Sequence, residues 1–230
     1  MSPPPVVIVA ARNEADRIGD TLDALADAFP GAHVVVADDA SSDGTGDVAL
    51  AHGAELVSRN RPHGKGGNVT AAVATVIDRA RDPDPPVFLL CDGDLGVSAG
   101  ELRPLVEAVA AARCDLAIAA FRSRVGGGFG VALRYAARAI ERLCGYRAGA
   151  PISGQRALSA AALRAAFPFA RGYGMEIGIT VDVVRAGLEV REVELDLAHR
   201  ATGRTLGGFV HRARQLRDFR RVYREKRRAE

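Results

Sequence analysis

Residues 87–94 read VFLLCDGD, and this stretch decides how the fold is interpreted. Its first five residues are all apolar, as in a strand of a parallel sheet that is covered on both faces. Asp92 and Asp94 follow at once, separated by a glycine, so both carboxylates are expected at the carboxyl edge of that sheet. Mg²⁺ and Mn²⁺ prefer oxygen ligands, and Mg²⁺ commonly takes one or two carboxylates together with substrate phosphates. The stretch therefore predicts a metal site that holds a diphosphate, although a solvated acidic turn would carry the same residues.

The segments around this stretch alternate between strand and helix patterns. Apolar runs predict strands, and apolar residues at helical spacing predict the helices between them. This alternation implies right-handed crossovers in a doubly wound, mostly parallel α/β sheet with helices on both faces, which binds ligands at its carboxyl edge. The expected strands are 6–11, 33–37, 55–58, 87–91 and 116–120, and the expected helices are 14–29, 43–52, 66–81 and 98–112.

Ser98 and Glu101 form the capping-box spacing that opens the helix 98–112. After this helix the pattern of the chain is less regular. Beyond it we expect a glycine-rich loop at 124–130, helices up to 143 and over 159–167 and 176–186, and a strand at 189–197. No linker divides the chain, so one domain is expected over 1–208, with two halves that meet near 120. A basic amphipathic helix is expected over 209–230.

Charge is distributed unevenly along the chain. Residues 209–230 hold nine basic and three acidic side chains, whereas residues 1–208 hold 22 basic and 25 acidic ones. No apolar run reaches the roughly 20 residues that span a bilayer, and the N-terminus lacks the pattern of a secretory signal. The cysteines are three in number and lack metal or redox spacing, which favours burial in a reducing cytoplasm.

Three further positions combine a chemically active side chain with a strand end or a helix start. Asp39 follows the second expected strand, where it could accept hydrogen bonds from a ribose or a base. Lys65 lies in a glycine cluster before a helix, where it could reach a diphosphate, although a flexible turn accounts for the glycines equally well. Glu176 follows a Gly-Tyr-Gly segment at a helix start, where it is either a base for an acceptor hydroxyl or a favourable charge for the helix dipole.

The order of the motifs is more specific than any one of them. Residues 6–25 (VVIVAARNEADRIGDTLDAL), 34–45 (VVVADDASSDGT), 64–68 (GKGGN) and 89–96 (LLCDGDLG) together resemble the family 2 glycosyltransferases, which have the GT-A fold. Further along, ISGQR at 152–156 resembles the acceptor-side segment of that superfamily. GYGMEIG at 172–178, followed by AHR at 198–200, is similar to glucosyl- and mannosyl-phosphoglycerate synthases and, more loosely, to polyprenyl-phosphate glycosyltransferases.

The resemblance implies roles for the residues of the first half and for one later histidine. The nucleotide sugar would be bound by Ala11, Asn13, Glu14, Asp39, Lys65 and Asp92. In this interpretation Glu14 and Asp39 lie near the base, and Lys65 approaches the diphosphate. The implied cofactor is Mg²⁺ or Mn²⁺, held by Asp92, Asp94 and His199.

The resemblance also implies roles for the second half. Gly127, Gly128, Ser153, Gly154 and Gln155 would border the acceptor. Glu176 would lie near the reacting carbon, and together with Asp94 it is the candidate catalytic residue. A base at Glu176 would invert the anomeric centre, whereas the likeness to the phosphoglycerate synthases implies retention.

The chain departs from the families that it resembles in two ways. Phosphoglycerate synthases are typically longer, and the Gln-x-x-Arg-Trp motif of processive members is absent, since the chain has no Trp. Transfer of a single sugar is therefore expected rather than polymer synthesis. One alternative is a sugar-1-phosphate nucleotidyltransferase, but residues 10–14 (AARNE) lack its GxGxRL-type loop. A second alternative is a nucleotide-sugar-binding module without turnover.

The expected partners follow from the same resemblance. A UDP- or GDP-sugar is the expected donor, and a small phosphorylated molecule or a polyprenyl phosphate is the expected acceptor. Peripheral contact of the basic C-terminal helix with the inner membrane surface and a homodimer are further possible associations, in a protein expected to be cytoplasmic. Nucleic acid is not expected as a partner, because aromatic side chains do not alternate with the basic ones.

Overall fold

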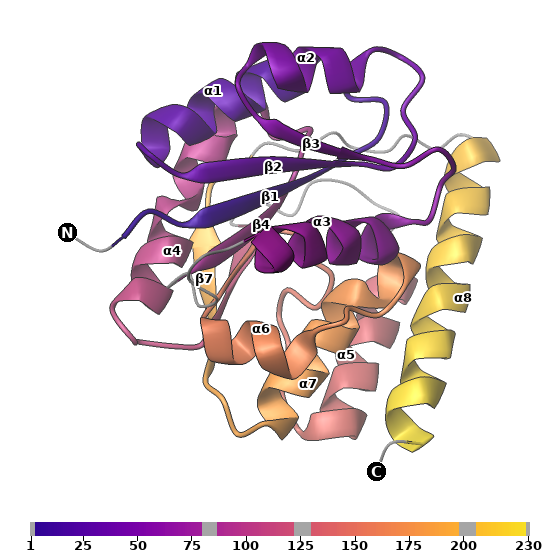
Figure 1. The fold of residues 1–230 in the computed structure, drawn as a ribbon. Helices are drawn as coiled ribbons and strands as arrows, with labels where there is room; N and C mark the ends of the chain where they lie inside the picture. Colours follow the sequence, from indigo (N-terminus) through magenta and orange to yellow (C-terminus); the bar gives the residue numbers. More distant parts are fainter. Residues whose placement is uncertain (1–2, 80–86, 122–129, 198–205, 229–230) are drawn as a thin grey trace.

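One mixed sheet organises the molecule (Figure 1). The computed structural model describes residues 3–79, 87–121, 130–197 and 206–228. Within these residues the sheet has seven strands in the order β3-β2-β1-β4-β6-β5-β7. The strands are β1 (Val6–Ala11), β2 (His33–Asp38), β3 (Glu55–Ser58), β4 (Phe88–Asp92), β5 (Leu116–Phe121), β6 (Arg156–Leu158) and β7 (Val190–Leu195).

Most strand pairs are parallel, as the sequence predicts. The exception is β6, which pairs antiparallel with β4 on one side and β5 on the other. The sequence pattern does not predict this strand, because it has only three residues and begins with Arg156. Its insertion brings the segment before it, residues 151–155, to the end of β4.

The helices cover the sheet on both faces, and three of them form a further layer. The helical elements are α1 (Ile18–Ala28), α2 (Thr45–Ala51), α3 (Lys65–Arg79), η1 (Gly96–Leu102), α4 (Arg103–Ala110), α5 (Gly130–Cys144), α6 (Ala160–Ala166), η2 (Gly172–Gly174), α7 (Met175–Arg185) and α8 (Leu206–Arg228). None of the helices in these described ranges is long and apolar enough to cross a membrane.

The alternation of side chains along β1 separates the two faces of the sheet. Val7 and Val9 belong to a core cluster with α1, η1 and α4, whereas Val6 and Ile8 belong to a cluster with α3, α6 and α7. Successive side chains of a strand point to opposite faces, so a continuous apolar run fills both clusters. Figure 1 shows α1 and α2 above the sheet and α3 and α6 below it.

The helix expected over 98–112 is divided into two elements. It forms the 3₁₀ helix η1 and then α4, and Pro104 lies at the start of α4, where a missing N–H costs nothing. The predicted capping box is wrong, because Ser98 lies inside η1 and its hydroxyl donates to Leu95 O at 2.7 Å. This region therefore begins with a 3₁₀ turn rather than with a serine cap.

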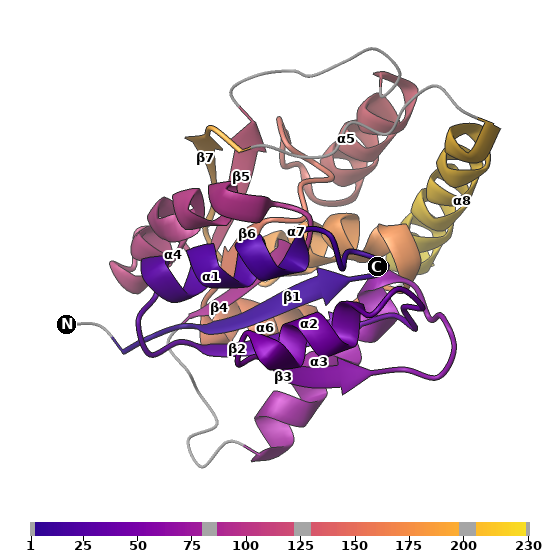
Figure 2. The same cartoon turned by 90° about the horizontal axis from the view of Figure 1, so that it is seen from above.

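The third layer joins α5, α7 and α8 (Figure 2). Phe219 and Val222 of α8 are almost fully buried against Ala136 and Ile140 of α5 and Ile177 of α7. The basic C-terminal segment is thus a helix whose apolar stripe packs on the body of the protein. The separation of 1–208 from 209–230 as distinct units stays a prediction.

Candidate active site

The site lies where β1, β2 and β4 end at one edge of the sheet. In the register of the parallel pairs, Ala11 lies opposite Asp38, and Ala10 lies opposite Asp92. Asp39 follows β2 directly, and its amide donates to Ala11 O at 3.0 Å. Because parallel strands bring their carboxyl ends to the same edge, the acidic residues after β2 and β4 flank the end of β1.

The turn after β4 is held by α1. Thr21 is completely buried, and its hydroxyl donates to Gly93 O at 2.9 Å and accepts the amide of Gly96 at 2.8 Å. Arg17 Nη1 donates to Asp94 O at 3.3 Å, which fixes the same turn from the start of α1. A side chain at Gly93 would press on Ala11 Cβ, at 3.3 Å. The Asp92-Gly93-Asp94 turn is thereby locked in place.

Lys65, the first residue of α3, is the central cation of the site. Its Nζ lies 2.6 Å from Asp92 Oδ1 and 3.1 Å from Glu176 Oε1. Burial opposes the charge, but the carboxylates of Asp92 and Glu176 outweigh it, so the pKa of Lys65 is raised. The ammonium is therefore charged at neutral pH and can serve as an electrostatic group but not as a base.

The segment 153–155 reaches the same point from the second half of the chain. Gln155 Nε2 donates to Asp92 Oδ2 at 3.0 Å, and Ser153 Oγ lies 3.4 Å from Gln155 Oε1. A Cβ at Gly154 would lie 2.5 Å from Asp92 Oδ2 and closer still to Lys65 Nζ. A glycine is therefore needed where this segment crosses the ion pair.

Arg156 is a residue of the site's framework that the sequence did not reveal. It is completely buried and donates to Ser153 O at 2.8 Å, to Glu176 O and Thr180 Oγ1 at 2.9 Å, and to Pro151 O at 3.4 Å. Burial lowers its pKa to about 10, against the opposing effect of nearby carboxylates such as Glu176. The guanidinium fastens the acceptor-side segment to the first turn of α7. Its sequence signals are its place at the end of the ISGQR segment and its charge at the start of an otherwise apolar triplet.

Glu176 occupies the first turn of α7 and is 5% exposed. The preceding turn η2 contacts α8: Tyr173 N donates to Asp218 Oδ2 at 3.2 Å. Gly172 has φ +63°, a left-handed conformation that favours glycine, and a Cβ there would collide with Asp218. The glycines of the GYG segment thus let α8 pack directly against the turn that carries Glu176.

The predicted nucleoside residues belong to loops that are joined by hydrogen bonds. Asn13 Oδ1 accepts the amide of Ser42 at 2.9 Å, and the Glu14 amide donates to Thr45 Oγ1 at 2.9 Å. These bonds join the loop after β1 to the loop after β2. Asp39 makes further hydrogen bonds: its two carboxylate oxygens accept the amides of His63 at 2.6 Å and Gly64 at 2.9 Å.

Asp39 therefore fixes the loop that leads into α3, whose first residue is Lys65. It is 5% exposed, and Arg12 approaches its carboxylate at 4.0 Å. Asp43 holds the loop after β2 just before α2, since Asp43 Oδ1 accepts the amide of Thr45 at 3.1 Å. Contact of any of these side chains with a nucleoside stays a prediction.

The residues present fit a hard divalent cation. Asp92 and Asp94 supply carboxylate oxygens on one fixed turn, which is the donor type and number that Mg²⁺ takes beside substrate phosphates. Within the described ranges, no three His, Cys, Asp or Glu side chains converge to form a complete metal cluster. The predicted third ligand, His199, and the predicted acceptor residues Gly127 and Gly128 lie outside the described residues.

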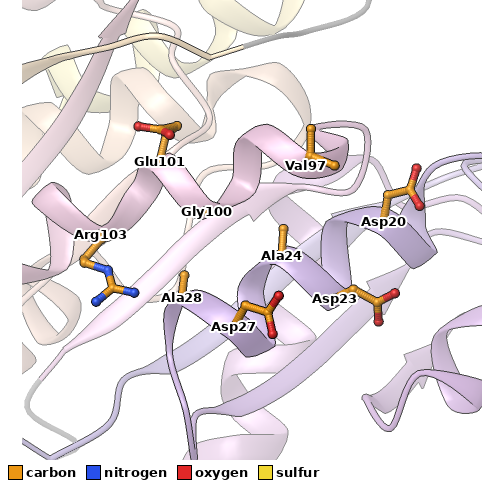
Figure 3. A pocket seen from close by; sticks show the side chains of 9 residues that line it. All are labelled: Asp20, Asp23, Ala24, Asp27, Ala28, Val97, Gly100, Glu101 and Arg103. Carbon is orange, nitrogen blue, oxygen red and sulfur yellow. The ribbon is translucent and has the colours of Figure 1, made fainter.

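A depression of about 550 Å³ lies elsewhere, between α1 and η1 (Figure 3). Asp20, Asp23 and Asp27 line it from α1, and Glu101 and Arg103 line it from the other side. None of its lining residues belongs to the group formed by Lys65, Asp92, Gln155 and Glu176, which we call the Lys65 cluster, so the depression is separate from the candidate active site.

Comparison with known proteins identifies the family of this chain. Residues 6–172 match the family model described as Glycosyl transferase family 2. The chain belongs to that family. It is accordingly a glycosyltransferase with the GT-A fold, as the motif order predicts, and neither the nucleotidyltransferase nor the inactive-module alternative is favoured.

A curated relative of this glycosyltransferase is the undecaprenyl-phosphate mannosyltransferase of Micrococcus luteus. The two sequences are 32% identical over 226 residues, and the match covers 90% of each chain. Among solved structures, glucosyl-3-phosphoglycerate synthase from Mycobacterium tuberculosis is similar. In complex with Mg²⁺ and UDP it has a TM-score of 0.78 and 25% identity, with 97% of this chain and 79% of that chain covered.

Other complexes of the same synthase give a consistent result. The complex with Mn²⁺, UDP and glucosyl-3-phosphoglycerate has a TM-score of 0.75 and 27% identity, with 97% of this chain and 80% of that chain covered. That relative binds a divalent metal, a uridine diphosphate and a phosphorylated product in one structure. The length difference matches the expectation that phosphoglycerate synthases are longer.

Proposed function

We propose that this glycosyltransferase moves a single sugar from a UDP- or GDP-sugar to the phosphate of a polyprenyl phosphate, with Mg²⁺ or Mn²⁺ as cofactor. The observation that carries the proposal is the Lys65 cluster. One cation contacts Asp92 of the nucleotide half and Glu176 of the acceptor half, and Gln155 of the acceptor segment contacts Asp92. The proposed donor and acceptor elements would therefore meet at a single point.

With a divalent metal bound, the charges of the site would suit a diphosphate leaving group. When bound, the metal neutralises part of the charge on the diphosphate and so helps it to leave. Asp92 and Asp94 would hold the metal, with His199 as the proposed third ligand. Lys65 would turn from Asp92 towards the diphosphate and stabilise the charge that develops there, which is the kind of interaction that lowers a transition-state barrier.

The acceptor chemistry follows from the bonds that change. An acceptor oxygen attacks the anomeric carbon, the bond from that carbon to the diphosphate oxygen breaks, and the nucleoside diphosphate leaves with the electron pair. A phosphate monoester is already largely ionised near neutral pH, since its second pKa is about 6. Its oxygen can attack without a base, which agrees with Glu176 being paired to Lys65 at 3.1 Å. Glu176 then orients Lys65 and the sugar.

The choice of a polyprenyl phosphate rests on the full-length relative. The Micrococcus luteus enzyme named as acting on undecaprenyl phosphate matches 90% of both chains. A phosphoglycerate acceptor is the second candidate, supported by the structural similarity to the synthase complexes. Both candidates carry a phosphate, but phosphoglycerate would attack through its hydroxyl, so this candidate alone would need a base to take up the hydroxyl proton.

The test is a transfer assay with radiolabelled UDP-glucose and GDP-mannose, each with Mn²⁺ and with Mg²⁺. Undecaprenyl phosphate in detergent and 3-phosphoglycerate are offered as separate acceptors. We expect label to move into an organic-soluble product with the lipid acceptor. Label that moves only to phosphoglycerate would replace the lipid by the second candidate, and no transfer from either donor to either acceptor would contradict the proposed function.

A further inference from the structure

The outward face of α8 has a strong and uniform positive charge. Residues 214–228 follow a helical period of 3.6, and the residues opposite the buried stripe of Phe219 and Val222 are almost all basic. The exposed members are Arg214, Arg217, Arg220, Arg221, Arg224, Glu225, Arg227 and Arg228. Seven arginines and one glutamate give this face, which we call the α8 face, a net charge of +6.

Little of this charge is neutralised within the protein. Arg221 Nε pairs with Glu225 at 2.8 Å, and Arg217 Nε lies 3.6 Å from Asp218. The remaining basic residue of the segment, Lys226, points inward and pairs with Asp182 of α7. Arg220, Arg224 and Arg227 have no ion-pair partner in the part of the chain that the structure describes.

The position of α8 links this charge to the active site. Figure 1 shows α8 at one side of the molecule, beyond the ends of β1 and β2. Asp218 accepts the amide of Tyr173, and a Cβ at Gly174 would lie 3.0 Å from Val222 Cβ, so the helix packs on the turn that precedes Glu176. A surface that binds the α8 face would therefore lie beside the acceptor half of the site.

We propose that the α8 face docks on an anionic lipid bilayer. This inference rests on the proposed function, because a polyprenyl phosphate acceptor stays in the membrane and the enzyme must reach it there. A row of cations on one helix suits a flat negative surface, to which each Arg adds attraction. Within residues 214–228 no exposed aromatic interrupts the arginines, since Phe219 is buried and Tyr223 is half-buried, so the stacking platform of a nucleic acid site is missing.

The test measures sedimentation of the full chain with vesicles of phosphatidylcholine, with and without phosphatidylglycerol. The variant carries Arg220→Gln, Arg224→Gln and Arg227→Gln. The matched control carries Arg103→Gln, Arg113→Gln and Arg191→Gln, three exposed arginines on or next to α4 and on β7, away from α8. Transfer to detergent-solubilised undecaprenyl phosphate is measured for all three proteins.

We expect the unmodified protein to bind only the phosphatidylglycerol vesicles and to dissociate as salt rises. The α8 variant should bind roughly tenfold to a hundredfold more weakly, by the loss of three attractive charges, while the control binds like the unmodified protein. All three should transfer sugar equally in detergent, because the arginines lie outside the Lys65 cluster.

Other outcomes would overturn the docking proposal. Equal vesicle binding by the α8 variant and the unmodified protein, or no binding by the unmodified protein at low salt, contradicts it. A dimer in analytical ultracentrifugation that the α8 variant abolishes, without any vesicle binding, would assign the α8 face to a second copy, whose acidic α1–η1 depression carries the opposite charge. Failure of transfer in detergent by the unmodified protein would contradict the proposed function, while the vesicle result would still decide the docking.

Discussion

Lys65 is the residue through which the two halves of the site contact each other. Its ammonium lies within ion-pair distance of Asp92, from the end of β4, and of Glu176, from the start of α7. An uncompensated carboxylate is costly to bury, so Glu176, whose side chain is 7% exposed, depends on this cation more than Asp92, whose side chain is 32% exposed. The consequence is that donor binding, which would draw Lys65 to a diphosphate, also changes the environment of Glu176.

Replacing Glu176 by Gln tests this dependence. The substitution keeps the size of the side chain but removes its charge, so Lys65 would be held by Asp92 alone. We expect turnover to fall at least about tenfold with nucleotide affinity nearly intact, as for loss of an interaction made in the transition state. Steady-state kinetics with varied donor concentration measure both quantities.

The matched control for Glu176→Gln is Asp182→Asn on the same helix. Asp182 pairs with Lys226 of α8 instead of Lys65, so this variant should lose stability but keep its turnover. Turnover of Glu176→Gln equal to that of the unmodified enzyme would remove Glu176 from the catalytic machinery.

Gly154 provides a second test at the scale of one residue. A methyl group there would push on Asp92 Oδ2 and on Lys65 Nζ. Gly154→Ala should therefore separate the ion pair and lower kcat/KM at least about tenfold, an effect on the charge stabilisers of the site. Gly100→Ala is the control, because the nearest atom to its added methyl is Ala24 O at 3.9 Å. Equal losses in the two variants would show that the effect is general destabilisation.

Among the elements, α1 has the clearest indirect role. Thr21 holds both sides of the Asp92–Gly96 turn, through Gly93 O and the Gly96 amide. The turn that carries the proposed metal ligands is therefore held by a helix that contributes no carboxylate to the metal site. Thr21 is thus a positioning residue for Asp94.

Thr21→Val is the variant that tests the role of α1. Valine has nearly the same shape but makes neither hydrogen bond, and each buried group left without a partner costs about 1–3 kcal/mol. We expect the Mn²⁺ concentration for half-maximal transfer to rise at least about threefold, which corresponds to about 0.7 kcal/mol in metal binding. Thr21→Ser keeps the hydroxyl and should retain the metal dependence of the unmodified enzyme. An unchanged metal dependence in Thr21→Val, despite lower thermal stability, would limit Thr21 to a structural role.

An element can be predicted from sequence when its own residues carry the pattern that forms it. The sequence predicts the strands β1, β2, β4 and β5 because a short apolar run that can fill both faces of a sheet is typical of a buried parallel strand. It does not predict β6, because the three residues of this strand begin with Arg156, whose charge is satisfied by carbonyl groups of residues 151, 153 and 176. Likewise Ser98 has the local signature of a cap, yet it lies inside η1.

For the site, the sequence predicted which residues carry charge but not how they connect. The sequence predicts Asp92, Lys65, Gln155 and Glu176 as site residues, and the structure brings them together. The ion pair of Lys65 with Glu176 joins residues 111 positions apart in the chain, and no local sequence pattern indicates such a contact. The sequence does not predict the role of Thr21 for the same reason, since its partners Gly93 and Gly96 lie far along the chain, and the bonds from Arg156 to Glu176 and Thr180 likewise join separate segments.

For the molecule as a whole, the packing of α8 indicates that the C-terminal helix and the body unfold together. Phe219→Ala removes a buried ring that contacts α5 and α7, and such truncations cost about 3–5 kcal/mol. We expect circular dichroism to show a single thermal transition at a lower temperature than in the unmodified protein. The control is Leu50→Ala, an exposed side chain whose loss should change stability by at most about 0.5 kcal/mol. A body that melts as in the unmodified protein while α8 alone is lost would show that 1–208 and 209–230 are independent units.

The central claim is that Asp94 holds a divalent metal on the diphosphate of a nucleotide sugar. The most direct test is the rate of sugar transfer to undecaprenyl phosphate, measured against Mn²⁺ concentration for the unmodified enzyme, Asp94→Ala and the exposed control Asp27→Ala. We predict that the unmodified enzyme and Asp27→Ala require the metal, and that Asp94→Ala is slower by at least about 10²-fold at every metal concentration. Full activity of Asp94→Ala in the presence of a chelator would contradict the claim.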